Sequence, residues 1–72
     1  MTPREKLLAA AVDYIADHGI TDLSLRELAA GLGTSHRMLI YHFGSKDGLL
    51  VAVVREMERR QRAALGDLAA EA

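Results

Sequence analysis

Residues 24–46, SLRELAAGLGTSHRMLIYHFGSK, constrain the fold of this chain more than any other segment. Ser24 and Glu27 form an S-x-x-E capping box, which is typical of a helix N-terminus. A second cap residue, Ser35, follows Gly33 closely, so one short helix must end and another begin there. Two short helices joined by a glycine turn form a helix-turn-helix, and this architecture is what the segment predicts.

The second of these helices is expected to run from the Ser35 cap to about Phe43. A step of about 100° per residue places Phe43 beside Leu39 on the buried face and turns Arg37 and Tyr41 away from it. In the preceding helix, the residues expected to face inward are Leu28, Ala29 and Leu32, and the residues expected to form the sharp turn are Gly31 and Gly33.

A longer helix is predicted on each side of this pair. The first begins at Thr2 and Pro3 and should end at Gly19 in a left-handed cap, with Ile20 folding back on Ile15. Its apolar face is Leu7, Leu8, Ala11, Val12, Ile15 and Ala16. The last helix begins after the Ser45 cap, with Leu49, Leu50, Val53, Val54 and Met57 as its apolar stripe. The charged residues that follow suit a solvated helix with i,i+3 and i,i+4 ion pairs.

Composition supports an all-α fold and narrows the possible functions. The chain has 72 residues, one proline and no cysteine, so we expect one small helical domain without disulfides or thiolate metal sites. His36 and His42 are not spaced as the i,i+4 pair of a zinc helix, and we expect no cofactor and no enzymatic activity. The apolar runs are too short to span a bilayer and the N-terminus is unlike a secretory signal, which predicts a soluble cytoplasmic protein.

Net charge alone does not indicate a nucleic-acid partner, since the chain carries a formal charge of −1. The distribution is uneven, however. Within residues 24–46 the only acid is Glu27, against Arg26, Arg37 and Lys46. A local basic surface of this kind suits contact with phosphates, although so short a window also becomes basic by chance.

Taken in order, these features resemble the N-terminal DNA-binding domain of TetR-family transcriptional regulators. The resemblance covers roughly residues 4–57, and its most specific parts are the LGTS turn, Tyr41-His42-Phe43 and Ser45-Lys46-x-x-Leu49-Leu50. It implies a homeodomain-like three-helix core plus a fourth linking helix, with residues 35–43 as the recognition helix in the major groove. The function it implies is that of a sequence-specific DNA-binding module of a regulator, most often a repressor.

The resemblance also implies a second domain. We expect residues 1–66 to form the helix-turn-helix domain and residues 67–72 to begin a C-terminal ligand-binding and dimerisation domain that is absent from this chain. The full-length form would then bind a palindromic double-stranded operator as a homodimer and sense a small-molecule effector through the absent domain. The fragment itself is expected to be a monomer.

Base contacts are expected from the outward face of the recognition helix. Arg37 is the first candidate, because its planar fork can bind guanine O6 and N7, whereas the alternative is a solvated surface arginine. Tyr41 resembles a position where the family places an aromatic against DNA, and the alternative is packing on the first helix. Met38 and Ile40 depart from the polar residues common in the family, so they either meet thymine methyl groups or cover the edge of the core.

Phosphate contacts are expected from residues around that helix. Lys46 joins a cation to the exposed amides of a helix N-terminus, and the alternative is an exposed lysine with no role. His42 resembles a position that contacts the DNA backbone in the family. Thr34, Ser35 and His36 lie at the turn, where the groove edge is expected. Arg26 is expected to reach phosphate or a neighbouring base, or to pair with Glu27 or Asp22.

One function from a different class remains open at the level of sequence. Arg37, Ile40 and Tyr41 would also suit a small helical protein–protein interaction module, because arginine and aromatic residues dominate the binding energy of protein interfaces. Binding that weakens steeply with salt would distinguish the DNA-binding function from this alternative.

Overall fold

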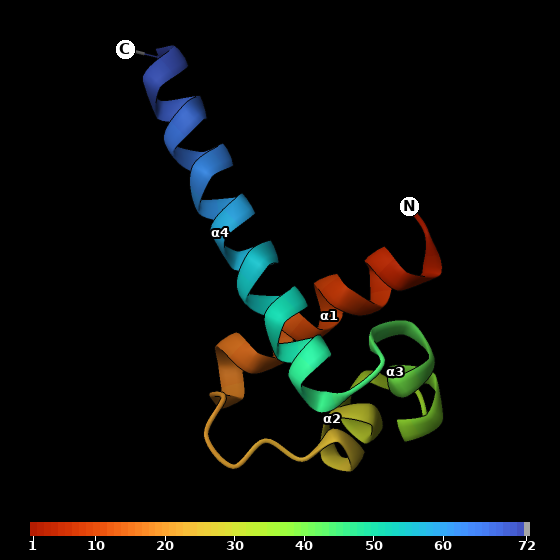
Figure 1. The fold of residues 1–72 in the computed structure, drawn as a ribbon. Coiled ribbons are helices and arrows are strands. Elements are labelled where there is room, and N and C mark those ends of the chain that lie inside the picture. The colour runs from red at the N-terminus through yellow and green to blue at the C-terminus, as the bar shows by residue number, and fades with distance from the viewer. Residues whose placement is uncertain (72) are drawn as a thin grey trace.

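The computed structural model describes residues 1–71, which form four α-helices and no strand. The helices are α1 (Pro3–His18), α2 (Leu25–Leu32), α3 (His36–Phe43) and α4 (Lys46–Glu71). Figure 1 shows α1, α2, α3 and the start of α4 gathered into a small bundle, from which the rest of α4 extends. The predicted all-α bundle with a helix-turn-helix is confirmed. Ala72, the last residue of the expected 67–72 segment, lies outside the described residues.

The predicted cap residues begin all four helices of residues 1–71, because each hydroxyl accepts a backbone N–H that has no partner within its helix. The four hydrogen bonds run from Glu5 N to Thr2 Oγ1 (3.1 Å), Glu27 N to Ser24 Oγ (3.4 Å), Met38 N to Ser35 Oγ (3.1 Å) and Gly48 N to Ser45 Oγ (3.0 Å). The helix starts are therefore local properties of the sequence.

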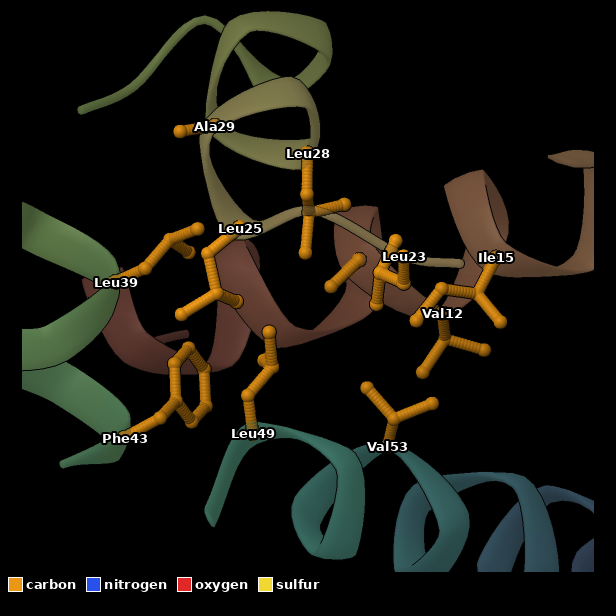
Figure 2. Close-up of a cluster of buried hydrophobic side chains, with 11 residues drawn as sticks. Val12, Ile15, Leu23, Leu25, Leu28, Ala29, Leu39, Phe43, Leu49 and Val53 are labelled. Atoms are coloured by element: carbon orange, nitrogen blue, oxygen red, sulfur yellow. The ribbon is translucent and has the colours of Figure 1, made fainter. Parts of the chain in front are cut away.

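One apolar core joins the four helices, with α1 packed on α2 and α4, and α3 packed on the same two helices. Figure 2 shows its side chains pointing toward a common centre. The buried set is Ala11, Val12, Ile15, Leu23, Leu25, Leu28, Ala29, Leu39, Phe43, Leu49 and Val53. Because α3 contributes only two of these residues, its position depends on how well Leu39 and Phe43 fit the shared core.

Two residues assigned to the apolar faces are in fact exposed. Ala16 lies in solvent and 45% of Val54 is accessible, whereas Leu25, which the periodicity did not single out, is buried. The helices that pack on α1 and α4 cover only the centre of each apolar stripe. Residues at the edge of a stripe therefore stay exposed even when their spacing suits the buried face.

The predicted end of α1 is wrong in its geometry. Gly19 does have a positive φ of 84°, but its ψ of 167° lies outside the left-handed helical region. Its N–H still bonds to the Ile15 carbonyl at 2.8 Å. The extended ψ directs the chain away from the helix, so Ile20 is 47% exposed and does not fold back on Ile15.

Gly31 does not belong to the turn as predicted, because α2 continues through it to Leu32. Its role is in packing: a Cβ atom at this position would collide with the ring of Tyr14 in α1. The ring of Tyr14 is in turn stacked on His18, with centroids 4.0 Å apart. Gly31 thus allows α2 to approach the aromatic ring of α1 closely.

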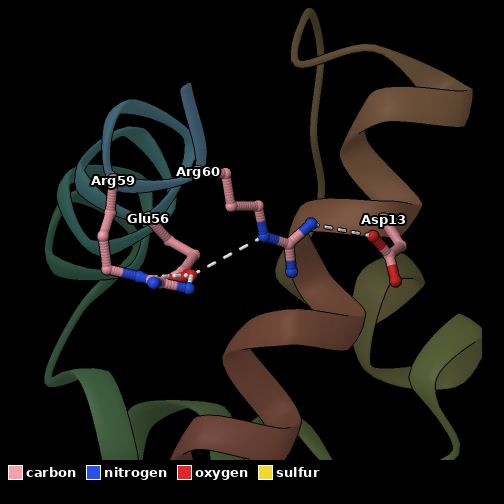
Figure 3. A network of polar contacts seen from close by, with 4 residues as sticks. All are labelled: Asp13, Glu56, Arg59 and Arg60. Atoms are coloured by element: carbon pink, nitrogen blue, oxygen red, sulfur yellow. Dashed lines mark hydrogen bonds and ion pairs between the residues drawn. The ribbon is translucent and has the colours of Figure 1, made fainter. Parts of the chain in front are cut away.

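The second half of α4 is a charged, solvated helix, and its predicted ion pairs are confirmed. Glu56 pairs with Arg59 and Arg60, and Glu58 pairs with Arg62. Arg60 also reaches across to Asp13 of α1, with Nη1 3.2 Å from Oδ1 (Figure 3). We call Asp13, Glu56, Arg59 and Arg60 the α4 ion-pair cluster.

The helix α4 runs through Gly66 without interruption to Glu71. At a rise of about 1.5 Å per residue, its 26 residues extend for about 39 Å. Residues 61–68 are all exposed. None of the described helices is both long and apolar enough to cross a membrane.

Candidate nucleic-acid interface

The turn between α2 and α3 is closed by two backbone hydrogen bonds. Gly33 takes the left-handed conformation, with φ 70° and ψ 28°, and its N–H bonds to the Ala30 carbonyl at 3.2 Å. The N–H of Thr34 bonds to the Ala29 carbonyl at 2.9 Å. This double closure is a Schellman motif, and the positive φ that it requires favours glycine. The turn thereby fixes the direction in which α3 leaves α2.

The helix α3 presents the face that its periodicity predicts. Leu39 and Phe43 are buried, with exposures of 1% and 8%, and hold the helix on the core. Arg37 is exposed on the opposite face, together with Tyr41, which is 77% exposed. This exposure is incompatible with the alternative in which Tyr41 packs on the first helix. An arginine and a tyrosine one turn apart therefore project from the same side of a short helix.

Met38 and Ile40 have different environments, although the sequence allowed the same two alternatives for both. Ile40 is partly buried and packs against the core cluster, so it covers the edge of the core. Met38 is 42% exposed. It lies in a shallow groove between the first half of α1 and one side of α3, which Thr34 and His42 also line. Of the two apolar side chains, Met38 is the one more accessible to a ligand.

The three cations of residues 24–46 are exposed and available for contact. Arg26, Arg37 and Lys46 take part in none of the ion pairs among the described residues. The proposed pairing of Arg26 with Glu27 or Asp22 is therefore not formed. Lys46 is the first residue of α4, beside the Ser45 cap, so its charge adds to the positive end of that helix.

The remaining candidates surround the start and the end of α3. Ser35 and His36 are exposed, whereas Thr34 and His42 are half-buried. The ring of His42 meets that of Tyr41 edge-on, with centroids 5.0 Å apart. The Ser35 hydroxyl oxygen already accepts the Met38 N–H that caps α3, so it has less hydrogen-bonding capacity left for another partner. No cluster of three His, Cys, Asp or Glu side chains that would suit a metal ion occurs in the described part of the chain.

Two cations of α1 were overlooked at the level of sequence. Lys6 lines the same groove as Met38, and Arg4 donates from Nε to the His42 carbonyl at 3.4 Å. Arg4 precedes Leu8 by four residues, so helical spacing places it in line with the packed face of α1. This i,i+4 spacing is the feature of the sequence that could have indicated that Arg4 lies near the core. The approach of α1 to the end of α3 was not readable from it.

A short helix held by two core residues, presented by a glycine turn and bordered by unpaired cations, defines a helix-turn-helix DNA-binding domain. Comparison with known proteins agrees. The family model described as bacterial regulatory proteins, tetR family, matches residues 7–53, which is more than half of the chain. The chain belongs to the tetR family, and its helix-turn-helix is the DNA-binding module of a transcriptional regulator.

Similar regulators are found in several bacteria. The HTH-type transcriptional regulator BetI of Stenotrophomonas maltophilia is 33% identical over 69 residues, which are 96% of this chain and 35% of BetI. The HTH-type transcriptional repressor AcnR of Corynebacterium glutamicum is 34% identical over 53 residues, or 74% of this chain and 28% of AcnR. The Mycobacterium bovis regulator Mb3439c is 40% identical over 48 residues, or 67% of this chain and 26% of that protein. The chain thus spans about a third or less of the length of these relatives. No solved structure matches it significantly.

Proposed function

We propose that this module inserts α3 into the major groove of an operator and reads its sequence through Arg37. The observation that carries the proposal is the outward face of α3, where Arg37 has no ion-pair partner among the described residues and Tyr41 is 77% exposed. Arg37 lies near the N-terminus of α3, the end of a recognition helix that usually approaches the bases, and its fork suits guanine O6 and N7. Tyr41 would contact the DNA one turn further along.

Met38 extends the proposed base contacts to thymine. Its exposed thioether side chain is apolar and lies at the edge of the same surface, where a thymine methyl group is the only apolar feature that the major groove offers. Ile40 stands beside it as a minor contact, since most of its packing is with the core. Replacing thymine by deoxyuridine in the bound site should weaken binding by about 0.8 kcal/mol for each contacted methyl group. Equal affinity for both duplexes would contradict the contact.

Phosphate contacts would fix the position of α3 on the duplex. We assign them to Lys46 and Arg26, on either side of the helix, and to His42 at its end. Thr34, Ser35 and His36 at the turn would approach the groove edge. The exposure of Lys46 and Arg26, together with their lack of ion-pair partners among the described residues, supports this arrangement.

The regulatory consequence would be repression by occlusion of a promoter. One of the relatives, AcnR, is named a repressor, which supports this direction of control. Two copies would occupy the half-sites of a palindrome, with their α3 helices in successive major grooves. Dimerisation and the response to a small-molecule effector would belong to a C-terminal domain that begins with residues 67–72. The 72-residue chain alone would be monomeric and would act in the cytoplasm.

Selection from a random pool of duplexes, followed by a salt titration, tests the proposed function. We expect an enriched half-site containing guanine and an affinity that falls steeply between about 50 and 200 mM salt. The competing function, a protein-binding patch on α3, predicts neither enrichment nor steep salt dependence, and the relatives do not favour it. Failure to enrich any sequence would reject the proposal.

A further inference from the structure

The carboxyl end of α3 is held by a residue outside the helix-turn-helix. Arg4, in the first turn of α1, donates a hydrogen bond from Nε to the carbonyl oxygen of His42 at 3.4 Å. The guanidinium carbon of the same side chain lies 4.9 Å from the centroid of the Phe43 ring. His42 and Phe43 are the last two residues of α3. A single side chain therefore contacts both a terminal carbonyl and a core aromatic of that helix.

The physical chemistry of helix ends explains why an arginine suits this place. The last four carbonyls of an α-helix have no partner within the helix, and the end carries a partial negative charge. A guanidinium supplies both an N–H donor and a positive charge, and its planar group also stacks on an aromatic ring. Arg4 thus satisfies one terminal carbonyl and interacts favourably with the Phe43 ring.

The helix α4 closes the other side of the same end. A Cβ atom on Gly48 would collide with the Phe43 carbonyl, so the first turn of α4 packs directly against the last residue of α3. The Gly44 N–H bonds back to the Ile40 carbonyl at 2.8 Å. The end of α3 lies between α1 and α4, whereas its start is fixed by the Gly33 turn. Arg4 is the polar contact that links this end to α1.

We propose that Arg4 is a positioning residue for DNA reading: it fixes the angle of α3 against α1 and thereby determines where Arg37 and Tyr41 meet the bases. Arg4 itself makes no phosphate contact in this proposal. The inference rests on the proposed function in so far as α3 reads the bases. The holding of α3 by Arg4, by contrast, is a property of the free protein and is testable without DNA.

The first experiment measures the free protein. Amide hydrogen exchange and the ring chemical shifts of Phe43 are compared in wild type, Arg4→Met, Arg4→Lys and Lys6→Met. Lys6→Met is the matched control, because it removes a cation from the same turn of α1 that makes no hydrogen bond or ion pair among the described residues. Relative to wild type, we expect faster amide exchange at Gly44 and shifted Phe43 resonances in both Arg4 variants. The Lys6→Met control should match wild type in both measurements. Gly44 exchange and Phe43 resonances that stay as in wild type in Arg4→Met would overturn the proposal, because Arg4 would then not hold the end of α3. Full rescue by lysine would overturn the assignment to the planar guanidinium, since lysine keeps both the positive charge and N–H donors.

The second experiment measures DNA binding on the selected site and on a scrambled duplex, over a range of salt concentrations. Arg4→Met should weaken binding to the selected site by about 5- to 10-fold, the size expected for the loss of one ordinary hydrogen bond. Binding to the scrambled duplex and the slope of affinity against salt should stay unchanged. These results would separate a loss of specificity from a loss of electrostatic attraction.

Two outcomes of this experiment would overturn the proposal. An equal loss on both duplexes, with a salt slope smaller by about one, would mean that Arg4 contacts phosphate. Unchanged binding to the selected site, together with faster exchange at Gly44, would mean that Arg4 stabilises α3 without positioning it. If wild type selects no sequence at all, the proposed function fails, and the exchange experiment alone decides whether Arg4 holds α3.

Discussion

Arginines in two regions of this domain have the same chemistry and opposite environments. In the second half of α4, Arg59, Arg60 and Arg62 all pair with carboxylates, and Arg60 also links α4 to α1 through Asp13. Around α2 and α3, Arg26 and Arg37 are exposed and pair with no carboxylate among the described residues. Charge is neutralised within the protein in the first region and is available to a partner in the second.

This difference explains how a chain with a net charge of −1 serves as a DNA-binding module. A phosphate backbone responds to the local potential of the surface it approaches, and acids paired with α4 arginines add little to the potential near α3. Net charge is therefore a poor guide for a domain in which Glu27 is the one acid within residues 24–46. The relevant quantity is the number of cations around α2 and α3 that are exposed and take part in none of the ion pairs among the described residues.

The largest expected effect on binding comes from comparing a substitution of one arginine in each region. Arg37→Ala should weaken binding to the selected site by about 1–3 kcal/mol, or about 5- to 150-fold, and relax preference at one base position. Arg62→Ala is the matched control, because its side chain is 77% exposed and its pairing with Glu58 spans 3.9 Å. Fluorescence anisotropy with the selected site and its single-base variants measures both. Similar losses from the two variants would contradict the division between the regions.

The two regions also differ at their helical glycines. Gly31→Ala in α2 should lower the free energy of unfolding by about 1–2 kcal/mol, because the new methyl group collides with the Tyr14 ring. Gly66→Ala in α4 meets no atom within 4 Å and should raise it by about 0.5–1 kcal/mol. Thermal unfolding followed by circular dichroism should show Tm changes of opposite sign, at about 4–8 °C per kcal/mol.

The Gly31 prediction has an internal control. Adding Tyr14→Ala to Gly31→Ala removes the ring that the methyl group meets, so the glycine substitution should cost less in that background. A double-mutant cycle measures the difference. An equal cost in both backgrounds would show that Tyr14 is not the reason for glycine at this position.

A smaller effect is expected at Lys46, for which we propose a phosphate contact. Lys46→Ala should weaken binding to all duplexes by a similar factor and reduce the slope of affinity against salt by about one, because one fewer counterion is released. Arg62→Ala should leave the slope unchanged. A loss confined to the selected site would instead place Lys46 among the base-reading residues.

The smallest effect concerns the pH dependence of the α4 ion-pair cluster. The hydrogen bond from Arg59 lowers the pKa of Glu56, assisted by the charges of Arg59 and Arg60 and opposed by partial burial. A carboxylate with a lowered pKa in the folded state contributes stability above its unfolded pKa, which is lost as the pH falls through the folded value. Wild type should therefore be more stable than Glu56→Gln at neutral pH, and the difference should shrink as the pH falls below the ordinary glutamate pKa and vanish below the lowered pKa of the folded state.

Thermal unfolding of both proteins from neutral to acidic pH measures this effect. The change in Tm should be small, since exposed ion pairs contribute little and are screened by salt. DNA binding by Glu56→Gln at neutral pH should match wild type, because the cluster includes none of the residues proposed to contact DNA. A pH-independent difference in Tm would show that Glu56 stabilises α4 by packing alone.

Much of the fold could be predicted from sequence because the interactions that define each helix are local. The caps at Ser24, Ser35 and Ser45 each act within three residues, and the structure confirms all three. The buried face of α3 follows from helical geometry in the same way, which is why Leu39 and Phe43 were identified as core residues. The DNA contacts proposed for Arg37 and Tyr41 depend on that face and remain predictions.

Tertiary structure decided what depends on neighbours distant in sequence. Arg60 and Asp13 are separated by 47 positions and Arg4 and His42 by 38, so no local pattern indicates that either pair meets. Gly31 makes room for the Tyr14 ring of α1 and is not part of a turn. Met38 and Ile40 differ in exposure only because the core covers Ile40. Capping and helical periodicity involve residues a few positions apart, so they can be predicted from the sequence. Burial, and the choice of which charges pair across helices, are decided only once the helices pack.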